Sequence, residues 1–215
     1  MTDTARLVIV TGLPGSGKST TAKWLAKFLL VTWIYRFITR PFRKGEKKGT
    51  ENLRISDKEF LRLKKAHKLF HPTETEIPHW GKHYRGFPVM STWIPLSGTD
   101  IMLVVPGPRA ALEILDQFPD AVAVFLTAPR EILVQRIRDR GDAWGTSNHP
   151  KKILEYDTMY GGLGIESEFE RRGIPVIDTN EVDPEAVARR ILSMLGVNPL
   201  KSKFMKGDSE SVSSP

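Results

Sequence analysis

The chain has 215 residues, 27% of them charged and 40% hydrophobic, a formal net charge of +7 and no cysteine. This length suits one domain, with or without small insertions, which buries about 70% of its unfolded surface. The lack of cysteine excludes disulfides, thiol catalysis and cysteine-based zinc sites, and it suits the reducing cytoplasm, where we expect the protein. The longest apolar run, Phe28 to Tyr35, is far below the roughly 18 residues of a membrane span. We therefore expect no membrane segment, and the start of the chain predicts no cleaved signal.

The first predicted strand leads into a glycine loop. The apolar run Leu7 to Val10 is followed by Gly-Leu-Pro-Gly-Ser-Gly-Lys-Ser over residues 12–19 and by a helical pattern from Thr20 to about Leu30. This is the G-x-x-x-x-G-K-[ST] template in its required context of strand, loop and helix. A tight turn alone needs neither the lysine nor the serine. The sequence therefore predicts binding of a nucleoside triphosphate.

Each residue type in the loop has a physical reason. The glycines allow consecutive N–H groups to face inward and to hold the β-phosphate together with the positive end of the following helix. Lys18 supplies charge between the β- and γ-phosphates, and the Ser19 hydroxyl is the predicted Mg²⁺ ligand. The predicted residues for binding ATP and Mg²⁺ here are Gly12, Gly15, Ser16, Gly17, Lys18, Ser19 and Thr20.

Strands and helices alternate through the rest of the chain. One strand is expected over Val31 to Thr39, a basic surface loop over residues 40–49, and a helix capped by Ser56. Lys64 to Pro95 shows no regular pattern. Later segments predict strands at Ile101–Val105, Ala121–Leu126 and Val176–Asp178, and helices at Arg109–Phe118, Pro129–Arg138 and from Asp183 to Gly196. This alternation predicts an α/β fold with a parallel sheet covered on both faces and a ligand crevice at the carboxyl ends of the strands.

With these residues in place, the chain resembles the guanylate kinase superfamily of P-loop kinases from about Arg6 to Leu195. Besides the phosphate loop, the resemblance rests on Thr39 to Glu46 with the following Ile55 to Phe60, on Pro119 to Pro129, and on the arginine-rich Leu133 to Gly141. It implies a P-loop NTPase three-layer fold with an acceptor-binding insertion (about 36–97) and an arginine-rich lid (about 136–160). The kinase-like domain would then span residues 1–198, with a disordered tail over 199–215.

The resemblance also implies roles for particular residues. Superfamily residues that match Arg40, Arg43 and Tyr84 hold the phosphate of the acceptor, so the resemblance implies the same role here. An arginine suits this role because its fork donates two parallel hydrogen bonds to phosphate oxygens. Residues matching Arg136 and Arg140 would neutralise the phosphoryl group in transfer, and Asn180 would contact adenine. On composition alone, the basic loop and the lid arginines also fit solvated surfaces, and Tyr84 also fits a packing role.

Several positions depart from guanylate kinases. The acidic side chains that would read guanine are replaced by Pro106 and Val104, His71 occupies the expected glutamate position, and Glu74 or Glu76 lies near it instead. Arg36 and Asn52 replace an expected serine and tyrosine. Ribose 1,5-bisphosphate kinases resemble the chain better at Tyr35 to Arg40 and at Thr50 to Asn52, whereas the loop length from Arg40 to Ser56 matches guanylate kinases. Without strand-end carboxylates, Mg²⁺ is left with Ser19, phosphate oxygens and water.

Three functions follow as hypotheses. The first is a kinase that moves the γ-phosphoryl group of MgATP to a small phosphorylated acceptor, a nucleoside monophosphate such as GMP or a ribose bisphosphate. The second is a non-catalytic binding module, and the third is a kinase of nucleic-acid ends, suggested by the net charge but lacking a single-strand groove motif. The histidine pairs His67/His71 and His79/His83 have helical spacing but lie in proline-broken sequence, so no metal site is expected there. We expect a monomer or homodimer that binds neither nucleic acid nor membrane.

Overall fold

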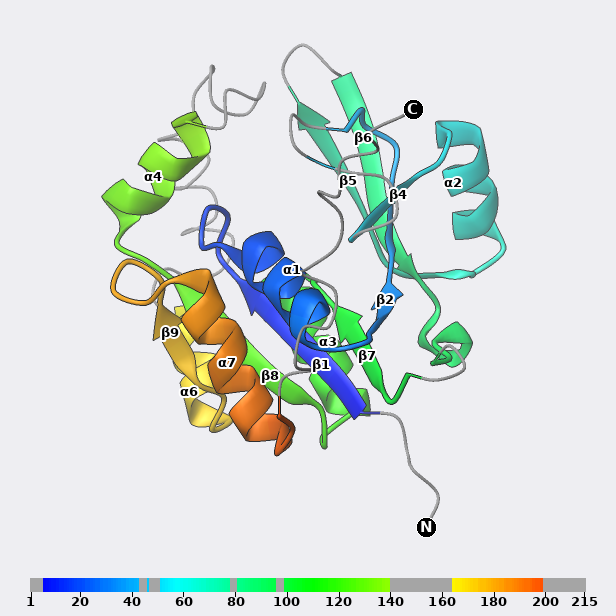
Figure 1. Cartoon of the computed structure of the whole chain (residues 1–215). Helices are drawn as coiled ribbons and strands as arrows, with labels where there is room; N and C mark the ends of the chain where they lie inside the picture. Colours follow the sequence, from blue (N-terminus) through cyan, green and yellow to red (C-terminus); the bar gives the residue numbers. More distant parts are fainter. Residues whose placement is uncertain are drawn as a thin grey trace, which may run out of the picture.

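Five strands form a parallel sheet with β1 (Arg6–Gly12) at its centre (Figure 1). The computed structural model describes residues 6–42, 46, 51–77, 81–95, 99–139 and 164–198. The strand order is β2-β7-β1-β8-β9, and all four pairings are parallel. The other strands are β2 (Thr32–Ile34), β7 (Ile101–Val104), β8 (Val122–Thr127) and β9 (Val176–Asp178). The predicted parallel sheet is confirmed.

Helices cover both faces of this sheet, which explains why its strands are apolar on both sides. Val8 and Val10 face a core built with α1 (Lys18–Phe28) and α7 (Pro184–Leu195). Leu7 and Ile9 face a second core built with α3 (Pro108–Gln117) and α6 (Gly164–Arg171). Figure 1 shows α1 and α7 in front of the sheet and α3 and α6 behind it. Burial of each large side chain contributes about 1.5–3 kcal/mol, so the predicted three-layer fold is stabilised from both sides.

A second sheet, of order β4-β3-β6-β5, lies beside the first and carries α2 (Asp57–Lys65) (Figure 1). Its strands are β3 (Arg36–Ile38), β4 (Asn52–Arg54), β5 (Leu69–Ile77) and β6 (Gly81–Pro88). The chain passes from one sheet to the other at Tyr35, because β2 pairs with β7 whereas β3 pairs with β4 and β6. The prediction of one strand over Val31 to Thr39 is therefore wrong, since local β-propensity does not reveal a change of partner.

The prediction that Lys64 to Pro95 has little regular structure is also wrong. Residues 69–88 contain the β5–β6 hairpin, followed by a short 3-10 helix, Met90–Thr92. Pro72, which discouraged a strand, lies at a register shift between Phe70 and Thr73, and neighbouring His71 has a φ of 48°. β5 is an edge strand, and edges and bulges are the places in a sheet that tolerate proline.

The predicted helices begin close to their predicted starts, whereas α6 was not predicted. Ser56 accepts a hydrogen bond from the Glu59 N–H at the start of α2, Asp183 caps α7, and Gly196 closes α7 with a φ of 65°. α4 (Arg130–Asp139) follows Pro129. In the part of the chain that is described, none of the helices is both long and apolar enough to cross a bilayer. The predicted tail over 199–215 lies outside the described residues.

Candidate active site

The phosphate loop connects β1 to α1 at the carboxyl edge of the parallel sheet. Gly12, Gly15 and Gly17 have φ angles of 138°, 85° and 85°, which L-residues with side chains rarely adopt. A Cβ on Gly12 would lie 2.0 Å from the Leu126 carbonyl oxygen, and a Cβ on Gly15 would lie 2.8 Å from that of Leu133. The first and second glycines are therefore required by close contact with β8 and α4 as well as by their backbone angles.

Lys18 and Ser19 lie in the first turn of α1. The Lys18 ammonium donates to the Leu13 carbonyl at 2.7 Å, so its side chain folds over the loop. The Ser19 hydroxyl donates to Glu51 Oε1, also at 2.7 Å. Ser16 is buried, and no described residue hydrogen-bonds its hydroxyl, whereas the Thr20 side chain is exposed. The Ser19–Glu51 contact joins the phosphate loop to the second sheet, because Glu51 directly precedes β4.

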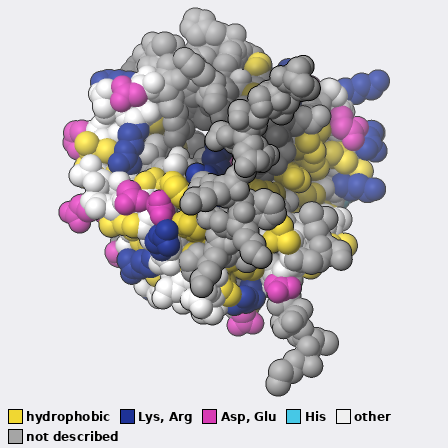
Figure 2. All heavy atoms as spheres, viewed as in Figure 1, with side chains coloured by type: hydrophobic (Ala, Val, Ile, Leu, Met, Phe, Trp, Pro, Cys, Tyr) yellow, Lys and Arg dark blue, Asp and Glu magenta, His cyan; other side chains and the backbone are white. Residues whose placement is uncertain are grey.

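Three arginines of the second sheet form a group that we call the arginine cluster: Arg36, Arg40 and Arg85. Arg36 donates to Asn52 through Nε and Nη2, and Arg85 donates to Thr73 through Nε. In register, Ile38 pairs with Arg85, so Arg85 and Arg36 lie on the same face of the sheet. Figure 2 shows dark-blue Lys and Arg side chains near the middle of the viewed face.

The charges of this cluster act on one another. Burial lowers the pKa of the Arg36 guanidinium, Glu51 opposes that shift, and nearby Arg85 and Arg40 lower the pKa further. Arg40 is only 8% exposed and forms a bidentate ion pair with Glu46, with both distances 2.7 Å. The three arginines outnumber the carboxylates that act on Arg36, which are Glu51 and Glu46, and this partly buried positive charge favours an anionic ligand.

Tyr84 lies on the other face of the second sheet. Its ring stacks on Phe60 of α2 with centroids 5.4 Å apart, and adjacent strand residues point to opposite faces, so Tyr84 points away from the side of Arg85. Glu74 and Glu76 pair in register with Tyr84 and Lys82, and Glu74 forms an ion pair with Lys82 at 2.6 Å. The structure thus brings Arg40, but not Tyr84, together with Arg36 and Arg85.

Sequence reasoning did not single out Arg85 or the side chain of Glu51. No local signal distinguishes Arg85 from Tyr84 as the residue that faces the cleft, because the choice depends on which face of β6 is covered by α2. Arg43 and Arg140, which were predicted to bind and neutralise phosphate, lie outside the described residues.

Arg136 connects α4 to the end of β9 and to the phosphate loop. It donates to the Thr179 hydroxyl and carbonyl, both at 2.8 Å, and makes a longer contact of 3.5 Å with the Gly15 carbonyl. Asn180 follows directly, exposed, with its backbone N–H bonded to Asp178. Among the predicted lid and adenine residues that the structure describes, Arg136 and Asn180 therefore lie near each other.

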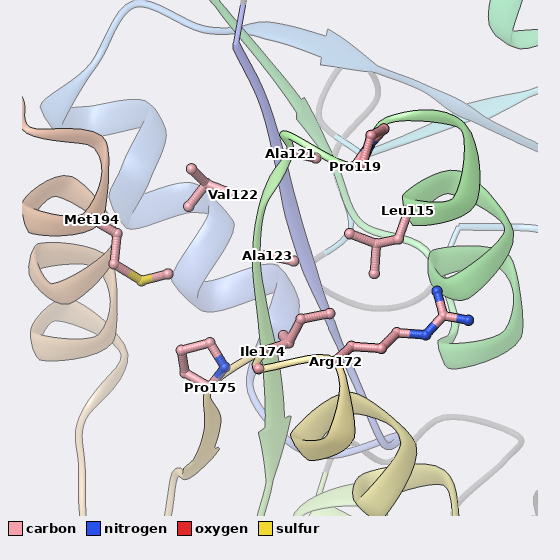
Figure 3. Close-up of a pocket in the computed structure, with 10 residues that line it drawn as sticks. Leu115, Pro119, Ala121, Val122, Ala123, Arg172, Ile174, Pro175 and Met194 are labelled. Carbon is pink, nitrogen blue, oxygen red and sulfur yellow. The ribbon is translucent and has the colours of Figure 1, made fainter.

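A pocket with a volume of about 420 Å³ lies elsewhere (Figure 3). Its lining includes Val122 at the start of β8 and Pro175 just before β9, so it is at the amino-terminal edge of the sheet. Ligands in parallel α/β sheets bind at the opposite, carboxyl edge, where the phosphate loop lies. We do not assign this pocket to the active site.

Comparisons with known proteins agree with this geometry. No family model matches the chain. It is 26% identical over 171 residues to a guanylate kinase of Fusobacterium nucleatum, covering 77% of this chain and 90% of that protein. It is 27% identical over 143 residues to a guanylate kinase of Prochlorococcus marinus, covering 66% of this chain and 75% of that one. These similarities support a guanylate kinase-like superfamily assignment for the chain.

A solved structure supports the same fold. The guanylate kinase of Anaplasma phagocytophilum superposes with a TM-score of 0.54 at 21% identity, covering 93% of this chain and 88% of that chain. The second residue after β7 remains a departure from guanylate kinases. Pro106 replaces the expected aspartate, and its carbonyl accepts the Thr11 hydroxyl at 3.2 Å.

Proposed function

We propose that this guanylate kinase-like protein transfers the γ-phosphoryl group of MgATP to the phosphate of a small acceptor, with GMP as the first candidate among nucleoside monophosphates. The observation that carries the proposal is the Ser19–Glu51 hydrogen bond of 2.7 Å, which joins the phosphate loop to the sheet that holds the arginine cluster. Two anionic substrates would thus meet in one cleft. The guanylate kinases that the chain resembles support this reaction class.

The chain's own residues would act mainly by positioning and charge. The N–H groups of the glycine loop and the start of α1 would hold the donor phosphates, and Lys18 would exchange the Leu13 carbonyl for phosphate oxygens. Mg²⁺ supplies charge neutralisation on the phosphates when bound, and hard oxygen donors such as the Ser19 hydroxyl suit it. No general base is needed, because the acceptor phosphate is already ionised at neutral pH.

On the acceptor side, we propose that Arg40 holds the acceptor phosphate together with Arg36, Arg85 and Arg43. Arg40 would share its guanidinium between Glu46 and the phosphate, which the fork geometry of arginine allows. Tyr84 remains a predicted phosphate ligand, although its stacking on Phe60 favours a packing role. Arg136 and Arg140 are proposed to neutralise the transferred group, and Asn180 to contact adenine.

Ribose 1,5-bisphosphate is a second candidate acceptor. Glu74 and Glu76 lie on the face of β5 opposite to Arg85, so they are poorly oriented to read guanine N–H groups beside the arginine cluster. Arg36 adds a cation where a second phosphate would be favourable. An acceptor with two phosphates and no base therefore has a specific structural argument in its favour.

The test is ADP release from ATP with GMP, dGMP, AMP, UMP, dTMP or ribose 1,5-bisphosphate as acceptor. We expect rapid ADP release only when an acceptor is present, and the acceptor that gives the highest kcat/KM identifies the substrate. Binding of ATP without transfer to any acceptor would favour the non-catalytic module. Failure to bind ATP in calorimetry would contradict the kinase altogether.

A further inference from the structure

The carboxylate of Glu51 is unusual in its position, because it contacts the residue that P-loop proteins use to hold Mg²⁺. Its Oε1 accepts a hydrogen bond from the Ser19 hydroxyl, with 2.7 Å between the two oxygens. A serine hydroxyl has one proton and two lone pairs, so donating that proton to Glu51 leaves the lone pairs for a cation. This pair offers the hard oxygen chemistry that Mg²⁺ prefers.

No acidic residue supplies this negative charge from the ends of the strands beside β1. In the described chain, β7 is followed by Val105 and Pro106, and β8 by Ala128 and Pro129. The nearest carboxylate bonded at the end of β8 is Glu166 of α6, which accepts the Thr127 hydroxyl at 2.6 Å. Glu51, by contrast, contacts the first turn of α1 directly through Ser19.

The backbone of the second sheet fixes Glu51 in place. Its carbonyl accepts the Arg36 N–H at 2.9 Å, and the following Asn52 is 1% exposed and bonded to the Arg36 guanidinium at 2.9 and 3.0 Å. Arg36 belongs to the arginine cluster. A carboxylate held by these bonds connects the phosphate loop with the proposed acceptor site.

We propose that Glu51 is a metal-site residue. It accepts a hydrogen bond from the Ser19 hydroxyl and so orients the hydroxyl oxygen toward Mg²⁺. Its carboxylate also provides the negative charge that the strand ends lack. This inference rests on the proposed function, since it assumes that a metal–nucleotide complex occupies the phosphate loop. It also makes the metal a link between the two halves of the cleft, because Glu51 comes from the second sheet. The alternative is that Glu51 only balances the charge of Arg36.

Metal affinity distinguishes the two roles without relying on turnover. Mn²⁺ binding to the protein–ADP complex is measured by electron paramagnetic resonance, and ADP binding without metal is measured by calorimetry. We expect Glu51→Gln to weaken Mn²⁺ binding tenfold or more, as loss of a carboxylate beside a metal ligand typically does, while metal-free ADP binding is retained. Glu51→Asp, which keeps the charge, should lose less.

Two matched variants complete the test. Glu59→Gln removes an exposed carboxylate of α2 that pairs with Arg62 and should leave Mn²⁺ affinity unchanged. Glu166→Gln removes the carboxylate at the end of β8. A loss below tenfold in Glu51→Gln, an equal loss in Glu51→Asp, or a loss confined to Glu166→Gln would overturn the inference and leave the kinase proposal standing. If the unaltered protein bound no ADP at all, both proposals would fail.

Discussion

At the scale of single residues, Gly12 shows how tightly the phosphate loop depends on its sheet. Its φ of 138° and the 2.0 Å that would separate a Cβ from the Leu126 carbonyl oxygen exclude any side chain without movement of the two central strands. Gly173 also has a positive φ, of 71°, but a Cβ added there would have nothing within 4 Å of it. Comparing substitutions at these two glycines therefore separates the cost of backbone strain from the cost of a steric clash with the sheet.

We expect Gly12→Ala to destabilise the protein by about 3 kcal/mol or more, because it adds overpacking to backbone strain. Gly173→Ala should cost about 1 kcal/mol, since it carries backbone strain alone. Urea denaturation of both variants measures the difference. Equal losses would mean that β8 can move away from the loop freely.

Lys18 is the residue whose charge matters most to the proposed reaction. Lys18→Ala should lower kcat by at least about 100-fold, as loss of one preorganised charge at a transferring phosphoryl group does. Loss of its bond to Leu13 should cost only about 1 kcal/mol of stability. Lys23→Ala, exposed on the same helix, is the control. ADP release and thermal melting are the measurements, and an unchanged rate in Lys18→Ala would contradict the mechanism.

The residues of the candidate site differ in how well sequence predicts them. The phosphate loop is local, so its spacing carries the whole signal. The positions of Glu51 and Arg85 depend on contacts between segments that are far apart in the sequence. Glu51 accepts a hydrogen bond from Ser19 of α1. Arg85 points to the side of Arg36 because its neighbour Tyr84 packs on Phe60 on the other face of the sheet. Such information is absent from the spacing of residues along the chain.

At the scale of elements, α4 joins the donor side of the cleft through Arg136. This side chain is held by Thr179 and by the Gly15 carbonyl, whereas Arg138 on the same helix is exposed. The helix thus presents one arginine toward the loop and one toward solvent. That arrangement provides a matched pair of substitutions.

We expect Arg136→Ala to lower kcat/KM by about 100-fold or more, because it removes both a cation beside the phosphates and a contact that holds β9 against the loop. Arg138→Ala should change kcat/KM by less than about threefold, as an exposed charge is screened. Steady-state kinetics with varied ATP measures both. If the two substitutions had equal effects, neither arginine would act on the reaction, and both would simply belong to the exposed face of the helix.

Most strands of the parallel sheet were predictable, whereas β2 and β3 were predicted as one strand and the β5–β6 hairpin was not predicted. Strands such as β7 and β8 are short apolar runs bounded by turns, and β1 is identified by the phosphate-loop motif that follows it. The β5–β6 hairpin instead has polar residues such as Thr73 to Glu76, with Pro72 at its bulge, so neither hydrophobic period nor composition reveals it. Exposure and an edge position remove the burial signal on which prediction depends.

At the scale of the whole molecule, the net charge of +7 suits the proposed binding of two phosphorylated substrates. Figure 2 also shows Lys and Arg side chains projecting at the right edge, where Figure 1 has α2. These charges alone could attract polyanions without specific recognition. Both kinds of binding weaken with salt, so phosphoryl transfer to the oligonucleotide is what separates non-specific attraction from use of a nucleic acid as substrate.

We expect single-stranded oligonucleotides to bind weakly at physiological salt and to receive no phosphoryl group. The measurements are fluorescence anisotropy over a range of NaCl concentrations and transfer from labelled ATP. A log–log salt slope that indicates many released counterions, together with phosphorylation of oligonucleotide ends, would instead establish the nucleic-acid kinase.

The central place of β1 also constrains how the protein is made. Arg6 pairs with Ile101 and Val8 with Val122, so β1 lies between two strands that are synthesised much later than itself. At a few residues per second of translation, this apolar segment waits for its neighbours for many seconds, and pairing across such separations is slow. We therefore expect Leu7 to Val10 to remain unpaired in the nascent chain until β7 and β8 have been synthesised.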